Sequence, residues 1–353
     1  MTKQFTQMAL AVATLTVGLV ASTTAWAADG SPVDEETGQI EQAGQGDRSW
    51  SLSADLVSRV GQGTFADLEN QTGTSGEQAP NASAFDRALL IYVLSGSYEV
   101  GDFTFSPEFT WTHWLTQGGG LNGPGEFRFQ DISLVSSWNG TKIEPLDSNL
   151  SASLEFSFPT SDVSQAQSKI VGVDGTVSIS HNLFDKVVVI GSVSGSKTFH
   201  RFKSPRVNID EVGEDNVLFR NNQAEDLGDG LIAIGGINTE YALSGTLTLS
   251  FPIVDKLRGT ISYGLAKYWT YNIDNNDDLN PEFADEGRGT QDLSSATVTL
   301  SYPINKYLSV SGGIVTRQPP KTDDNESFRF PFWNTQGAAS NYSSLQLALS
   351  ASY

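Results

Sequence analysis

Histidine is the side chain here with the widest range of catalytic chemistry, and the chain contains three. They stand in the tripeptides HWL, HNL and HRF, at His113, His181 and His200. None has a serine two residues away and the chain has no cysteine, so no nucleophile–base pair is visible. The glycines form no phosphate-binding fingerprint. The sequence therefore predicts no enzyme, although an Asp–His pair formed across strands stays open.

The acidic segment DNNDDLNPEFAD, residues 274–285, partly resembles a calcium-binding loop. Side chains with oxygen atoms stand at its first, third and fifth positions, Asp274, Asn276 and Asp278. The glycine that such a loop needs is Leu279, and its last position holds Asp285 in place of glutamate. A solvated loop is the favoured interpretation, with calcium as the alternative, and no other metal or cofactor is predicted.

Charge limits the partners that the chain can have. Lys3 is the only charged residue among the first 27, so the remainder carries 41 acidic residues against 20 Lys and Arg, a net charge of −21. Nucleic acid is excluded as a partner, because its phosphates need clusters of basic residues. The lack of cysteine excludes disulfides and a lipid-modified N-terminal cysteine.

The first 27 residues have the pattern of a secretory signal peptide. Residues 8–20, MALAVATLTVGLV, are apolar, and AWA at 25–27 offers small residues for cleavage before Ala28. This run of 13 residues is too short to cross a bilayer as a helix. Residues 28–47 are polar and acidic and are predicted to form a flexible tail.

From residue 48 onward, apolar and polar residues alternate in repeated segments, which predicts strands with one oily face. Short and long connections alternate between them, and 139–147 is medium-length where a short turn is due. The polar face is almost uncharged, whereas a soluble sandwich would tend to place Lys and Glu there. No stretch reaches 18 consecutive apolar residues, so no transmembrane helix is expected. Twelve strands are predicted: 48–60, 88–99, 102–115, 126–138, 148–158, 169–181, 186–201, 239–251, 256–271, 293–302, 306–317 and 342–353.

Aromatic residues gather at both ends of these segments, as they do where a membrane barrel meets its two interfaces. Trp50, Tyr98 and Tyr353 stand at the short-turn ends. Trp111, Trp114, Tyr268 and Trp269 are among those at the long-loop ends. A cluster of core aromatics would not explain rings at both ends of successive strands.

Residues 48–353 resemble a Gram-negative outer-membrane β-barrel of the porin-like class. The closing SSLQLALSASY is similar to the C-terminal signal read by the barrel-assembly machinery, with Leu345, Leu347 and Leu349 alternating before a terminal Tyr353 where the family usually has Phe. The resemblance implies an all-β fold: a transmembrane antiparallel up-and-down β-barrel of about 12 strands, with short periplasmic turns and long extracellular loops. It implies outer-membrane lipid as surroundings, and leaves the oligomeric state open. The last strand is expected to pair with the first.

Six charges interrupt the small polar face of the strands and are predicted to point into the lumen. They line a pore and set its solute preference, or they form a salt-bridge network that stiffens or closes the barrel. The predicted function is passive diffusion of small hydrophilic solutes or ions with a preference for cations. The alternatives are a non-conducting barrel that binds a partner through its long loops, and a soluble periplasmic all-β protein. The six charges are Asp55, Arg59, Glu108, Glu155, Asp174 and Arg258.

The longest connection, residues 202–238, is a candidate constriction loop. Folded into the lumen, it would narrow the pore and place four carboxylates there. A solvated surface loop is the alternative. The carboxylates belong to Asp210, Glu211, Glu214 and Asp215.

Overall fold

The computed structural model describes residues 49–61, 88–115, 127–183, 186–208, 224–226, 231–234, 237–274, 287–322, 325–333 and 343–353. The predicted signal peptide and the acidic tail at 28–47 lie outside these ranges. Among the described residues, no helix is long and apolar enough to cross a membrane.

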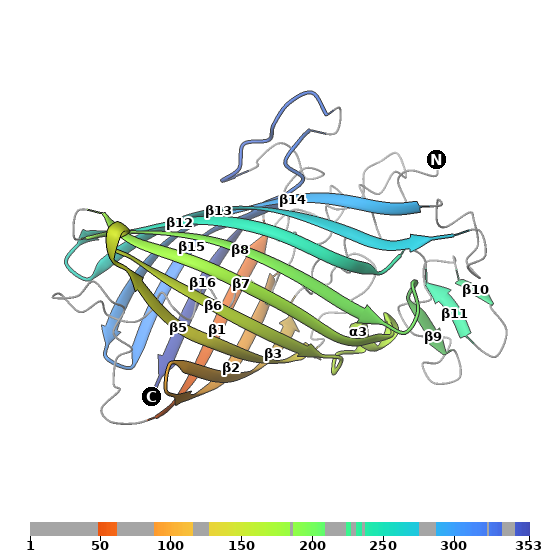
Figure 1. The fold of residues 1–353 in the computed structure, drawn as a ribbon, viewed down its shortest axis with the longest axis horizontal. Helices are drawn as coiled ribbons and strands as arrows, with labels where there is room; N and C mark the ends of the chain where they lie inside the picture. The colour runs from red at the N-terminus through yellow and green to blue at the C-terminus, as the bar shows by residue number, and fades with distance from the viewer. Residues whose placement is uncertain are drawn as a thin grey trace.

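Twelve antiparallel strands close into a barrel (Figure 1), which confirms the predicted fold class. Short β4 pairs with β3 as β5 does, so β4 and β5 count as one interrupted strand. The strands are β1 (Trp50–Gly61), β2 (Ala88–Val100), β3 (Phe103–Trp114), β4 (Phe127–Phe129), β5 (Ile132–Ile143), β6 (Ser148–Phe158), β7 (Lys169–Leu183), β8 (Val187–His200), β12 (Thr239–Val254), β13 (Leu257–Ile273), β14 (Gly287–Asn305), β15 (Leu308–Gln318) and β16 (Ser343–Ser352).

The barrel closes where the last strand meets the first. β16 pairs with β1 over Ser53↔Ser352 to Gly61↔Ser344, as the sequence predicted. Tyr353 continues the ladder, because its backbone N–H donates to the Leu52 carbonyl at 2.9 Å and its carbonyl accepts from Leu52 at 3.0 Å. Closure leaves no unpaired strand edge, which a sheet in lipid cannot tolerate.

Short turns gather at one end of the barrel and long connections at the other. The connection at 139–147, medium-length in the sequence, is a short turn in the structure. β5 continues to Ile143 through a bulge, so that only a single 3₁₀ turn (η3, Glu144–Leu146) joins it to β6. Gly140 permits the bulge with φ +92, where an added Cβ would collide with the Leu150 carbonyl.

The wall of the barrel is taller on one side. β12, β13 and β14 have 16, 17 and 19 residues, whereas β15 and β16 have 11 and 10. Since about 9–11 tilted residues cross a bilayer, the longer strands extend beyond it at the long-loop end. The six extra residues at the start of β14, 287–292, were missed because GRGTQD lacks alternation.

Part of the long-loop end has structure of its own. A short helix, α3 (Asp162–Ala166), lies between β6 and β7. β9 (Arg206–Asn208), β10 (Ala224–Asp226) and β11 (Leu231–Ile234) form a separate three-stranded sheet beyond the end of β8 (Figure 1). The connection at 202–238 therefore contains three short strands that the sequence did not indicate.

Candidate pore lining

Strand parity decides which side chains face the lumen. Opposite residues in an antiparallel pair share a face, and neighbours along a strand alternate. Leu345 and Leu347 are 63% and 60% exposed and Leu247 is 59% exposed, which identifies the oily outer face. All six predicted lumen charges lie on the opposite, inward face, across from residues such as Ser350, Gln346 and Ser301.

Three carboxylates share one side of the lumen, here called the acidic wall: Glu108 on β3, Glu155 on β6 and Asp174 on β7. Glu155 lies directly opposite Asp174 in the register and within electrostatic range of both other carboxylates. Hydroxyl groups support the wall. Thr110 donates to Glu108 at 3.3 Å, and Thr176 donates to Asp174 at 3.2 Å.

Two guanidinium groups form a basic wall on β1 and β15. Arg59 donates to the Gln346 Oε1 atom at 3.2 Å, on the strand between them, and lies within electrostatic range of Arg317. Arg317 was missed because it stands at the last position of its predicted strand, although its parity with Val315 and Gly313 gives an inward direction. Tyr268 interacts electrostatically with both Arg317 and Asp174, so it lies between the two walls.

The six predicted lumen charges do not neutralise one another in direct pairs. Of the described residues, no two of the six predicted lumen charges form an ion pair with each other. Asp55 hydrogen bonds with Ser350, and Arg258 donates to Ser250 at 3.3 Å near the short-turn end. The structure thus places three of the six in the acidic wall and one, Arg59, in the basic wall.

The inward face of β2 is apolar in its extracellular half, contrary to the mostly small polar lining expected. Leu89, Ile91 and Val93 alternate on it and are 2–7% exposed. They cluster with Val57, Trp114 and Ala348 from the adjoining strands. The prediction that Trp114 and Tyr268 belong to an outer aromatic belt was wrong, because each has the inward parity of its strand and is buried.

A buried ion pair fastens α3 to the barrel at the long-loop end. Asp131 stands between β4 and β5, and its Oδ2 atom accepts from the Lys169 Nζ at 2.7 Å; the side chains are 7% and 9% exposed. Asp131 also accepts hydrogen bonds from Ser161 and Ser164 at the start of α3. Burial by itself raises the pKa of Asp131, but Lys169 and these hydroxyl groups outweigh it and hold that pKa below its ordinary value.

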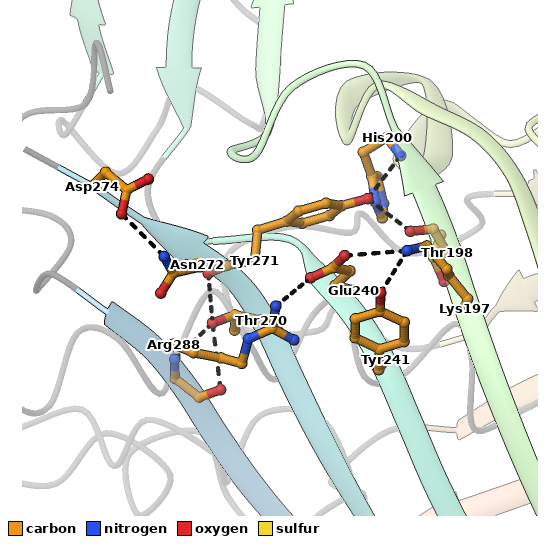
Figure 2. A network of polar contacts seen from close by, with 11 residues as sticks. Lys197, Thr198, His200, Glu240, Tyr241, Thr270, Tyr271, Asn272, Asp274 and Arg288 are labelled. Carbon is orange, nitrogen blue, oxygen red and sulfur yellow. Dashed lines mark hydrogen bonds and ion pairs between the residues drawn. The ribbon is translucent and has the colours of Figure 1, made fainter. Parts of the chain in front are cut away.

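A second polar network joins four tall strands at the same end (Figure 2). Glu240, at a bulge in β12, accepts from the Lys197 Nζ at 3.3 Å and from Arg288 at 2.8 Å. Lys197 also donates to the Tyr241 hydroxyl at 2.6 Å. On β13, the Tyr271 hydroxyl donates to the Thr198 carbonyl at 2.8 Å. These contacts hold the rim of the barrel together where the strands leave the expected bilayer.

One serine meets a histidine across strands, at the short-turn end. The Ser148 hydroxyl lies 3.1 Å from the His181 Nδ1 atom but donates its hydrogen to the Leu146 carbonyl at 2.9 Å. With the serine hydrogen directed at the Leu146 carbonyl, the serine oxygen is left to accept a hydrogen bond from the imidazole. Since Ser148 is also 3% exposed, the pair fixes a turn and is not a nucleophile with its base.

Several predicted site residues lie outside the described residues: Asp210, Glu211, Glu214, Asp215, Asn276 and Asp278. Asp274 is described, and its Oδ1 accepts from the Asn272 amide at 3.0 Å. Within the described ranges, no three His, Cys, Asp or Glu side chains are grouped so that they could hold a metal ion. The calcium and constriction-loop hypotheses stay predictions.

A closed antiparallel barrel with an oily exterior and a largely polar, charged interior has the architecture of an outer-membrane β-barrel. Its short turns therefore face the periplasm and its long loops the outside. No family model and no curated protein matches the chain.

Solved structures with a similar shape include three outer-membrane proteins. An outer membrane channel from Pseudomonas putida F1 has 10% identity and a TM-score of 0.49, covering 89% of this chain and 98% of that one. The NanC porin has 8% identity and a TM-score of 0.40, covering 86% and 98%. The KdgM porin has 11% identity and a TM-score of 0.39, covering 86% and 99%.

Proposed function

We propose that this barrel is a passive diffusion channel for small hydrophilic solutes or ions, with a preference for cations. The observation that supports it is the separation of Glu155 on β6 and Asp174 on β7 from Arg59 on β1, across the lumen. Charges that only stiffened the wall would be expected to neutralise one another directly. Charges held on opposite sides are available to a passing solute, as the lining of a selective pore requires.

The preference for cations is supported by the sequence of the connections at the extracellular end. Residues 275–286 contain five acids and no base, and 209–223 contain four acids and one base, Arg220. These segments join strand ends around the mouth. Negative charge around an entrance raises the local concentration of cations and lowers that of anions.

Conductance in a planar lipid bilayer tests the proposal. The full mature chain, folded to a heat-modifiable barrel, is expected to give discrete current steps. In a KCl gradient, the sign of the reversal potential is expected to show K⁺ passing more readily than Cl⁻. Correctly folded protein that gives no steps would contradict the channel, and a Cl⁻-selective reversal potential would contradict the cation preference alone.

The second candidate is a barrel that does not conduct and acts through its long loops. The apolar cluster on the inward faces of β1, β2, β3 and β16 favours it, because an apolar lining disfavours water and ions. Residues 28–47 are a candidate plug in this case. Deleting them separates the candidates: conductance that appears or rises only after the deletion favours a plugged barrel.

A further inference from the structure

The connection after β15 folds back on the lipid side of the barrel. We call residues 319–333 the flap; the structure describes 319–322 and 325–333 of it. Figure 1 draws this dark-blue segment outside the barrel wall, beside β14. The Lys321↔Phe328 bridge and the hydrogen bond from the Arg329 N–H to the Pro320 carbonyl at 2.9 Å make it a small hairpin.

Two outward-pointing side chains fix the flap to the wall. Thr316 opposes Ala296 and Ser343 and has the same parity as Ile314, so it points outward, as does Gln318 opposite Ser294. The Thr316 hydroxyl donates to the Phe332 carbonyl at 2.7 Å, and the Gln318 amide donates to the Phe330 carbonyl at 2.6 Å.

The covered wall is polar, and the flap removes it from lipid. Thr316, Gln318 and Ser294 are 0%, 1% and 3% exposed although all three point outward. A hydroxyl or amide group facing hydrocarbon without a partner would cost several kcal/mol. The backbone carbonyls of the flap supply partners for Thr316 and Gln318, and the Ser294 hydroxyl donates to the Gln318 carbonyl at 2.9 Å.

The flap presents aromatic rings on its own outer side. Phe328 is 79% exposed, Phe330 53% and Trp333 52%. The Phe330 and Trp333 ring centroids lie 4.6 Å apart, and Phe330 also contacts Phe332 at 5.9 Å. A packed group of exposed rings on a surface continuous with the lipid-facing exterior is suited to the boundary between headgroups and acyl chains.

The strands beneath the flap lack such rings. In the extracellular halves of β14, β15 and β16, no outward position is aromatic. Elsewhere on the barrel the strands supply them: Tyr92, Trp111 and Phe127 cluster on β2, β3 and β4. The aromatic girdle thus has a gap, and the flap covers its β14–β15 part, where the outward-pointing Ser294, Ala296 and Thr316 are 3%, 1% and 0% exposed. The outward residues there include Thr290, Asp292, Ser294, Ala296, Val298, Ile314, Thr316, Gln318, Ser343 and Leu345.

We propose that the flap is a membrane anchor whose rings insert into the outer-leaflet interface and complete the aromatic girdle over β14 and β15. Its charge does not select an anionic lipid, because Lys321 and Arg329 are outnumbered by Asp323, Asp324 and Glu326. Insertion therefore depends on the apolar area of the rings. We expect the flap to insert equally well into phosphatidylcholine vesicles with and without the anionic lipid phosphatidylglycerol.

The cysteine-free chain allows one fluorescent probe to be placed at a chosen site. A polarity-sensitive dye is attached to Ser327→Cys, which is exposed and next to Phe328, in the full mature chain folded in phosphatidylcholine vesicles. Lipids brominated near the headgroup should quench it, and lipids brominated near the acyl terminus should quench it less. The control is Ser194→Cys, which faces the lumen opposite Thr176 and should be quenched by neither.

A variant with Phe330→Ser and Trp333→Ser removes two rings and keeps the backbone carbonyls that hold Thr316 and Gln318. Quenching at position 327 should fall to the level of the lumen control while heat modifiability is retained. A probe at 327 that is unquenched in the parent chain would overturn the proposal. Thiol cross-linking of position 327 between two chains without quenching would also overturn it, by showing a second copy on the flap.

Discussion

A single carboxylate, Asp131, makes the stability of the extracellular end of the barrel depend on the external pH. Its folded-state pKa is held below the ordinary value, so the ionised form is the one that folding favours. The stabilisation is present above the unfolded pKa of about 3.9 and is lost as the pH falls through the folded pKa. We therefore expect α3 to be released from the wall only in acid, at a pH below about 3.9, and to be unaffected by changes of pH near neutrality.

Asp131→Asn is expected to lower the free energy of unfolding at pH 7 by about 3 kcal/mol, because it leaves the Lys169 ammonium buried without its counter-charge. The loss of stability in acid should then be smaller than in the parent chain. Urea titrations followed by tryptophan fluorescence between pH 7 and pH 3 measure both effects.

The control for Asp131→Asn is Lys142→Ala, which breaks an exposed ion pair of 2.8 Å with Asp147. Lys142 holds the pKa of Asp147 below its ordinary value, yet water screens the pair. Stability should hardly change. An equal loss in both variants would show that the buried location of Asp131 is not the reason for its effect.

Glu240 is the residue on which the rim network depends, because it accepts from both Lys197 and Arg288. Glu240→Gln keeps the shape and removes the charge, so two charge-assisted hydrogen bonds weaken together. The free energy of unfolding is expected to fall by about 1.5–3 kcal/mol. Lys267→Gln, which affects a looser pair with Asp292 at 3.7 Å, is the matched control. Equal stability of Glu240→Gln and the parent chain would contradict a bracing role.

At the scale of elements, the β5–β6 hairpin depends on one glycine. Gly140→Ala must place a Cβ against the Leu150 carbonyl at a φ of +92. We expect a loss of about 1–3 kcal/mol, or failure of the hairpin to form. Gly175→Ala is the control, because a Cβ there meets nothing within 4 Å. Thermal unfolding monitored by loss of heat modifiability compares the two variants.

The strands could be predicted because apolar and polar residues alternate within each short segment of the sequence. The closure of the barrel follows from the even number of strands and from the apolar alternation of the last strand, Leu345 to Tyr353. The assembly role of that last stretch stays a prediction. What local pattern cannot give is the side of the wall that a connection takes. The flap lies outside because Thr316 and Gln318 meet carbonyls from residues 330 and 332, a tertiary contact with no periodic signal.

The candidate site was predictable in its residues but not in its arrangement. The inward direction of Glu108, Glu155 and Asp174 follows from parity within each strand. Their grouping follows from the order of strands around the barrel, which puts β3, β5, β6 and β7 side by side. Trp114 was misjudged since its place at a strand end was considered without its parity. Alternation along a strand therefore tells which side of the wall a residue faces, whereas the order of strands in the closed barrel determines which residues lie beside it.

At the scale of the whole molecule, the two walls set a field across the lumen. Glu155 and Asp174 come from β6 and β7, and Arg59 and Arg317 from β1 and β15, so closing the barrel puts these two groups on opposite sides, whereas only β2 separates Glu108 on β3 from β1. A cation is attracted to the acidic wall and repelled by the basic wall, and an anion experiences the reverse. A single charge 4 Å from an ion in water changes its energy by about 1 kcal/mol, which corresponds to an about fivefold change in local concentration.

Neutralising one wall should therefore shift ion selectivity in a direction set by its sign. Glu155→Gln with Asp174→Asn is expected to lower K⁺ over Cl⁻ permeability, and Arg59→Gln with Arg317→Gln to raise it, each by about fivefold or less. The reversal potential in a KCl gradient measures this directly. Asp292→Asn removes a carboxylate from the outer face and should leave the potential unchanged. Shifts of the same sign in both wall variants would mean that passing ions do not sense the walls separately, because only opposite walls of opposite charge predict opposite shifts.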